Sequence, residues 1–162
     1  MEYHEPTASN LGEAEEISKQ IAVEVALLIN IEQAFRIALD WKTDHRGNIR
    51  KLSTLRFVAR SFERHLTRVR ALSEYGGYMH LVTDMKPQLS RDVQKLKELR
   101  DDLQAHLERM MLRMEHLSPA DASAFEGLCA ELEDYLKDLG SHAEREMDLL
   151  QRCFAEEEGG SG

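Results

Sequence analysis

The sequence predicts an all-α protein, an up-down-up-down four-helix bundle with a short connector helix between the second and third long helices. Only three of the 162 residues are proline, and leucine, glutamate, arginine and alanine, which are good helix formers, are abundant. Four long segments carry apolar residues at alternating steps of three and four, the period of an amphipathic helix. Short segments with turn residues separate them, which favours antiparallel neighbours.

A chain of 162 residues can bury a self-sufficient core, so one domain is expected. We expect a flexible lead-in over residues 1–12, where Pro6 and Gly12 lie and no apolar period is present. The bundle should occupy residues 13–157. Residues 158–162, which end in Gly-Gly-Ser-Gly, are expected to form a flexible tail.

The first half of the bundle should contain two long helices and the connector. The first long helix is expected over residues 13–40, and a turn that contains Gly47 follows it. The second is expected over about 49–75, where Gly76 stops it. The connector helix should then cover residues 78–85.

The second half should contain the other two long helices. The third is expected to begin at Ser90, as its N-cap, and to continue to about residue 117. The fourth should cover about 119–157, because Ser118 and the proline after it form a start signal. Gly140 lies inside this helix and is expected to mark a bend or a close helix contact.

Charge disfavours a nucleic-acid-binding role. The net charge is −9 and the isoelectric point about 5.3, whereas a nucleic-acid binder needs a basic face. One basic cluster does occur at helical spacing, and we expect it to form a solvated helix face that pairs with nearby acids. It consists of Arg56, Arg60, Arg64 and Arg68.

The two cysteines and the hydropathy favour a cytoplasmic location. Cys129 and Cys153 lie about 24 residues, or ~36 Å, apart on one expected helix, so they cannot bond within one chain. Both are interpreted as small core residues in a reducing compartment. No signal peptide is recognised, and no run of 18 apolar residues could span a membrane.

The most informative pattern is a polar pair within an apolar stripe on the fourth long helix. His142 and Glu146 occupy positions where leucine would be expected, and a buried imidazole or carboxylate needs a partner or a metal. The stripe comprises Leu128, Leu132, Tyr135, Leu139, His142, Glu146, Leu149 and Cys153.

Counting residues from the turns places further polar residues of the inward helix faces near this pair. At the height of His65 along the bundle we expect about residue 23, next to Glu24, and also Arg100. His142 should be level with about residue 94. We therefore expect Glu24, His65, Arg100, His142 and Glu146 to converge in one half of the core. His106 is expected to lie about twelve residues, or ~18 Å, from this layer, outside the site.

Two interpretations of this polar layer stay open. Two imidazoles and two carboxylates (His65, His142, Glu146 and Glu24) could hold a divalent metal between facing helices. Alternatively, Arg100 would repel a metal and pair with a carboxylate, so that a metal-free Arg–Glu–His layer fixes helix register. A ferritin-like oxidase is disfavoured, because the Glu-x-x-His pairs that it needs are missing.

Two segments resemble the hemerythrin-like, or HHE cation-binding, domain. The segment Ser141-His-Ala-Glu-Arg-Glu-Met-Asp-Leu-Leu150 is similar to the closing HxxxE motif of that family. Arg64-His65-Leu-Thr-Arg-Val-Arg-Ala-Leu72 is similar to its motif on the second helix. The resemblance covers about residues 15–155 and implies a non-haem di-iron centre that carries or senses oxygen, stores iron, or responds to nitric oxide and redox stress.

By position, His65, His142 and Glu146 match ligands of that family, and Glu24 is the nearest candidate on the first helix. Val69 stands where the family has a carboxylate, and Arg100 stands where it has a histidine. The resemblance therefore implies a degenerate site for non-haem iron and dioxygen in a sensing protein that is not an enzyme. The alternative is a metal-free interaction module with an unknown protein partner or a second copy of the chain.

Overall fold

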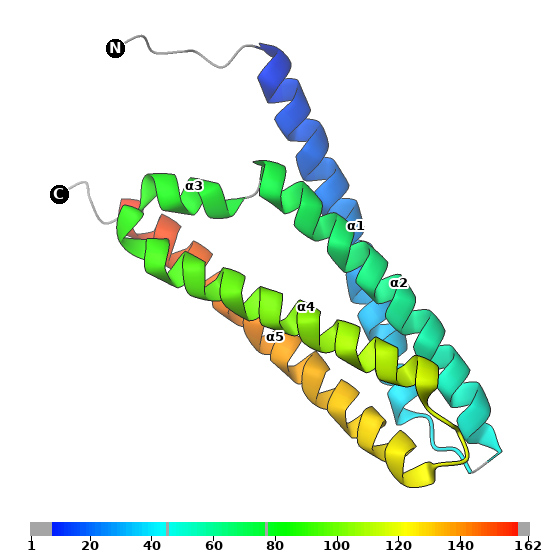
Figure 1. Ribbon diagram of the computed structural model, residues 1–162. Helices are drawn as coiled ribbons and strands as arrows, with labels where there is room; N and C mark the ends of the chain where they lie inside the picture. The colour runs from blue at the N-terminus through cyan, green and yellow to red at the C-terminus, as the bar shows by residue number, and fades with distance from the viewer. Residues whose placement is uncertain (1–7, 45, 77, 159–162) are drawn as a thin grey trace.

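The computed structural model describes residues 8–44, 46–76 and 78–158 (Figure 1). All regular structure in these ranges is helical, which confirms the predicted all-α class. The elements are α1 (Ala8–Asp40), α2 (Gly47–Gly76), α3 (Tyr78–Met85), the 3-10 helix η1 (Pro87–Leu89), α4 (Ser90–His116) and α5 (Ala122–Glu158).

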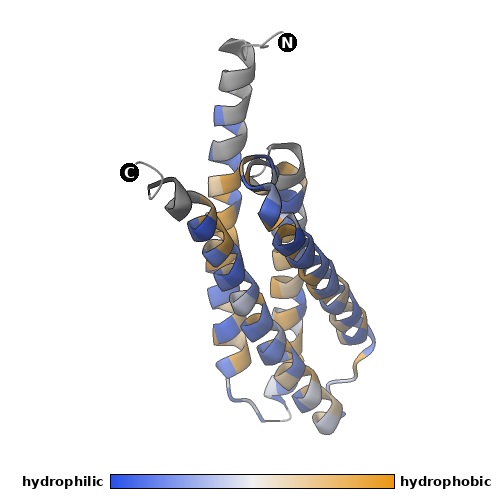
Figure 2. Ribbon diagram, turned by 90° about the vertical axis from the view of Figure 1, so that its left-hand side faces the viewer, coloured by the Kyte–Doolittle hydropathy of each residue, from blue (hydrophilic) through white to orange (hydrophobic). Residues whose placement is uncertain are grey.

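The long helices pack as two pairs that converge at one end. α1 packs along α2 and α4 packs along α5, while α2 also contacts α4 and α1 contacts α5. Figures 1 and 2 show the α1–α2 and α4–α5 connections at the same end. The two pairs diverge toward the opposite end, where α3 lies near the end of α5 (Figure 1). We call these the closed end and the open end.

The main apolar core lies toward the closed end, where all four long helices contribute to it. Phe62 meets Phe35 and Tyr135 edge-on, with ring centroids 6.3 and 6.4 Å apart, a favourable aromatic geometry. The buried members with the largest side chains are Phe35, Leu52, Leu55, Phe62, Leu107, Met110, Met114, Leu128, Leu132, Tyr135 and Leu136.

A second, smaller core lies at the open end, where α3 packs on α4 and α5. Among the residues whose burial the structure describes, its buried members are Val82, Val93, Leu96, Leu149 and Cys153. Cys153 is fully buried, as expected of a core residue, while Cys129 is only half-buried beside the main core. Both thiols are free.

Basic side chains close the helix ends at the closed end. Lys51 is buried, and its Nζ donates hydrogen bonds to the carbonyl oxygens of Leu39 (2.7 Å) and Trp41 (2.8 Å), where α1 ends. Arg56 Nε donates to the carbonyl oxygen of Met114 at 2.7 Å, at the end of α4. These bonds satisfy carbonyl groups that a helix end leaves without partners.

The expected solvated arginine face is therefore only partly correct, because Arg56 is a half-buried cap. Arg60 pairs with Glu115 at 3.2 Å, and Arg68 lies 3.5 Å from Glu24, as expected of solvated arginines near acids. Arg64 is exposed.

Helix starts differ from the sequence-based expectation. α1 begins at Ala8, so residues 8–12 are helical and not a lead-in, whereas residues 1–7 and 159–162 lie outside the described ranges. α5 begins at Ala122, because Asp121 Oδ1 accepts a hydrogen bond from the Ala124 amide at 3.1 Å. Ser118 instead accepts from the Ala120 amide at 3.3 Å, in the turn before the helix.

Ser90 is also not the N-cap that the sequence predicted. The 3-10 helix η1 runs directly into α4, so Leu89 precedes the helix and no side chain caps it. Among the described residues, no helix is both long enough and apolar enough to cross a membrane.

Candidate functional site

Glu24 on α1 and His65 on α2 form a close pair. The Nδ1 atom of His65 lies 2.5 Å from Oε2 of Glu24, and the two side chains are 17% and 16% exposed. The hydrogen bond with His65 lowers the pKa of Glu24 below its ordinary value and outweighs the opposing effect of desolvation. The expected proximity of these two residues is confirmed, while their role as metal ligands stays a prediction.

His142 on α5 is held by two groups of the protein. It is buried, and its Nε2 lies 3.0 Å from the carbonyl oxygen of Leu96 on α4. Because a carbonyl oxygen only accepts, Nε2 carries the proton of this bond. The Nδ1 atom faces Oε1 of Glu146 at 3.6 Å, one helical turn further along α5. The contact with Leu96 agrees with the expected level near residue 94.

A cavity of about 290 Å³ lies between the four long helices, next to this histidine. Its walls are mostly apolar, and polar side chains enter it from each helix. The Nε atom of Arg100 is buried and has no hydrogen-bond partner among the described residues. The polar lining residues are Glu32, Arg70, Arg100, Gln104, His142 and Glu146.

The expected polar layer is therefore divided. Arg100, His142 and Glu146 line the cavity, whereas Glu24 and His65 do not. Within the described ranges, no group of three or more His, Cys, Asp or Glu side chains is arranged to hold a metal ion. The described contacts join the four predicted ligands as two separate pairs, one between α1 and α2 and one within α5.

Sequence reasoning missed a third histidine–carboxylate pair. His106 on α4 lies with Nε2 2.9 Å from Oε1 of Glu131 on α5, and Arg113 also contacts this carboxylate. Hydrogen bonding to His106, and then to Arg113, lowers the pKa of Glu131. The sequence feature that could have indicated this pair is the position of His106 between Leu103 and Met110, at the edge of the apolar stripe of α4.

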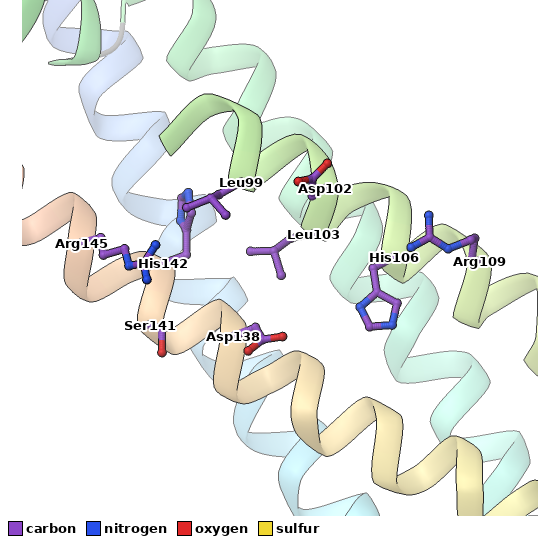
Figure 3. Close-up of a pocket in the computed structure, with 9 residues that line it drawn as sticks. All are labelled: Leu99, Asp102, Leu103, His106, Arg109, Asp138, Ser141, His142 and Arg145. Atoms are coloured by element: carbon purple, nitrogen blue, oxygen red, sulfur yellow. The ribbon is translucent and has the colours of Figure 1, made fainter. Parts of the chain in front are cut away.

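His106 and His142 both line an open cleft of about 450 Å³ between α4 and α5 (Figure 3). Figure 3 shows Leu103 and His106 pointing from α4 toward α5, and His142 pointing from α5 toward α4. The imidazole of His106 also meets the ring of Tyr135 edge-on, with centroids 5.9 Å apart. The two histidines thus line one cleft from facing helices, while the expected separation of His106 from the polar layer stays a prediction.

The Tyr135 hydroxyl is buried and has no hydrogen-bond partner among the described residues. Burial, and then the charge of Glu32, raise the pKa of this hydroxyl well above its ordinary value, so it stays protonated.

Gly140 makes no close helix contact, because a Cβ atom built there meets nothing within 4 Å. The glycine instead lines the cavity beside Leu139 and His142.

Comparison of the chain with protein-family models, with curated proteins and with solved structures gives no match. The resemblance to the hemerythrin-like domain therefore depends only on the quoted segments. What the described residues offer chemically is a set of paired imidazoles and carboxylates and a cavity lined by an arginine whose Nε atom is buried.

Proposed function

We propose that the chain is a metal-free interaction module, an up-down-up-down four-helix bundle in which paired polar side chains fix the helix register. The observation that carries this proposal is the position of Arg100. Its guanidinium shares the cavity with His142 and Glu146, and its Nε is removed from solvent. A metal ion held by these two residues would therefore lie near the positive charge of the guanidinium, which is unfavourable.

The helix contacts support the bundle arrangement. α1–α2 and α4–α5 are joined by contacts of α2 with α4 and of α1 with α5, so each long helix has two long neighbours. The pairs Glu24–His65 and His142–Leu96 each cross from one helix to another. Directional polar contacts of this kind disfavour helices that have slipped by one turn, since slipping would leave the groups without partners.

An interaction role is supported by apolar side chains that α1 leaves exposed. Val23, Leu27 and Ile29 are 60%, 39% and 52% exposed, respectively. Figure 2 shows that apolar residues are frequent along the described part of this helix. Such residues on one helix are available to contact another protein or a second copy of the chain.

The double variant Arg100→Leu/Glu146→Leu tests the register role. Replacing a buried polar layer with apolar residues of similar volume is often neutral or stabilising by about 1–4 kcal/mol. We therefore expect an unchanged or increased free energy of unfolding in urea, and loss of a single helix register, seen as broadened or doubled amide resonances. A large loss of stability would contradict the proposal, because the two residues would then be needed as charged groups.

One observation favours a second candidate, a hemerythrin-like protein that binds non-haem iron. A metal-ligating histidine usually donates its other ring N–H to a carbonyl or carboxylate, as Nε2 of His142 does to Leu96. This leaves Nδ1 facing Glu146. In this candidate His65 and His142 supply nitrogen, and Glu146 and Glu24 supply oxygen.

Iron content of the His142→Ala variant tests the second candidate. After growth with added iron, the candidate predicts iron in the wild-type chain and a loss of it in the variant. His106→Ala serves as the matched control, because this histidine also pairs with a carboxylate but lies outside the proposed ligand set. Equal iron content in all three proteins would count against the assignment.

A further inference from the structure

We propose that the cavity between the four long helices binds a small apolar carboxylate, with the carboxylate at Arg100 and the hydrocarbon part along the cavity walls. This goes beyond the register role proposed above. It depends on the shape of the cavity, on the charges that face it and on the space beside Gly140.

Apolar side chains form most of the cavity wall, and they come from every long helix. α1, α2, α4 and α5 each contribute, and the volume of about 290 Å³ lies near the lower limit of about 300 Å³ for small-molecule sites. Such a volume suits a short hydrocarbon chain. The apolar lining residues are Ile21, Val25, Leu28, Ile29, Phe62, Leu66, Val69, Leu103, Leu139 and Ala143.

The sign of the ligand follows from which charged groups already have partners in the protein. Glu32 accepts a hydrogen bond from Arg36 at 2.7 Å, and Glu146 faces His142 at 3.6 Å. Arg70, the second cation on the cavity wall, pairs with Asp101.

Arg100 differs from these groups, because its buried Nε has no acceptor among the described residues. A buried donor without a partner costs free energy, and an anionic acceptor is its strongest complement. The cavity therefore holds an unused donor on a guanidinium, and an anionic group joined to an apolar body matches both the wall and this donor.

A ligand can enter past α1. Val25 and Ile29 line the cavity and are nevertheless 39% and 52% exposed, so this wall is open to solvent. A small ligand is favoured over a protein partner as the occupant, because the unpaired donor is buried, where a flat protein surface has poor access to it.

Gly140 offers a way to fill the cavity without changing its charge. It lines the cavity, and a Cβ atom there meets nothing within 4 Å, so Gly140→Leu adds a side chain where space exists. Gly127 is the matched control, because it lies on the same helix with equally open surroundings but is exposed and away from the cavity.

Isothermal titration with decanoate and with decanol, its neutral counterpart, tests the proposal on the full chain. The wild-type chain should bind decanoate more tightly than decanol. Arg100→Gln should weaken decanoate binding about tenfold or more and leave decanol binding unchanged, because only the charged hydrogen bond is lost. Gly140→Leu should abolish binding of both probes, and Gly127→Leu should bind like the wild type.

Circular dichroism establishes that each variant is folded, and the Gly140→Leu result decides the test if Arg100→Gln does not fold. Binding of neither probe to the wild-type chain would overturn the proposal. It would also be overturned by equal affinities for the two probes in wild type and Arg100→Gln, or by unchanged binding to Gly140→Leu.

A stable dimer that binds no decanoate would assign the open wall to a second copy of the chain. The stability of the Arg100→Leu/Glu146→Leu variant is a separate readout, so the register proposal can fail independently.

Discussion

The closed end buries a lysine side chain and the open end buries one nitrogen atom of an arginine, and the hydrogen bonding of these two donors differs. At the closed end Lys51 donates to two carbonyl oxygens, at 2.7 and 2.8 Å, and thereby completes the end of α1. Toward the open end the Nε of Arg100 is buried without an acceptor among the described residues, beside a cavity. The lysine completes a helix end, whereas the arginine is left with bonding capacity for another molecule.

The surroundings of these two residues differ in the same way. The main core contains edge-on aromatic pairs and side chains from all four long helices. Five of the residues whose burial the structure describes form the second core, and the cavity lies between the diverging helix pairs. Incomplete packing is expected where a protein uses its interior for function rather than for stability.

The largest expected effect comes from truncating two fully buried leucines on α5. Leu132 belongs to the main core and Leu149 to the second core. Leu132→Ala should lower the free energy of unfolding by about 3–5 kcal/mol and Leu149→Ala by about 2–3 kcal/mol, because fewer of the described residues form the second core. Urea denaturation measures both, with the exposed Leu112→Ala as a control that should change stability by less than about 0.5 kcal/mol. Equal losses at the two sites would remove the distinction between the two ends.

A smaller effect is expected from replacing the two basic residues with methionine. Lys51→Met removes two charged hydrogen bonds to carbonyl groups and should cost about 1.5–3 kcal/mol. Arg100→Met removes a buried donor that lacks an acceptor, so stability should be unchanged or higher. Thermal and urea unfolding compare the stabilities of the two variants. A loss of unfolding free energy in Arg100→Met as large as that in Lys51→Met would show that the protein itself satisfies this guanidinium.

The smallest effect concerns acid stability at the Glu24–His65 pair. The pKa of Glu24 is lowered in the folded chain, so its ionised form stabilises the fold. This contribution should be fully present above the ordinary glutamate pKa of about 4.3 and should be lost as pH falls through the lowered folded-state value. Urea unfolding of wild type and Glu24→Gln across this range should therefore converge in acid. If the difference in unfolding free energy between the two proteins instead grew on acidification, the assigned lowering of the Glu24 pKa would be contradicted.

Much of the fold followed from periodicity and turn residues. The connector helix was predicted at its observed bounds, Tyr78–Met85, and the second long helix within two residues of Gly47–Gly76. Counting from the turns also placed Glu24 beside His65, because antiparallel neighbours that share a short turn keep equal heights.

Other features depend on local geometry that the pattern does not encode. Ser118 and Asp121 are both good caps, and only the turn before α5 decides that Asp121 caps the helix. Ser90 lost its expected role because a 3-10 turn precedes it. The His106–Glu131 contact depends on the rotation of α4 against α5, which spacing along one helix cannot fix.

Elemental analysis of untagged wild-type protein, combined with its absorption between 300 and 400 nm, tests the central claim most directly. The claim is that protein groups alone hold the histidine and carboxylate pairs, without a metal. The expected result is a metal content far below one ion per chain and no absorption band in this range. Stoichiometric iron with such a band, both lost in His142→Ala, would contradict it.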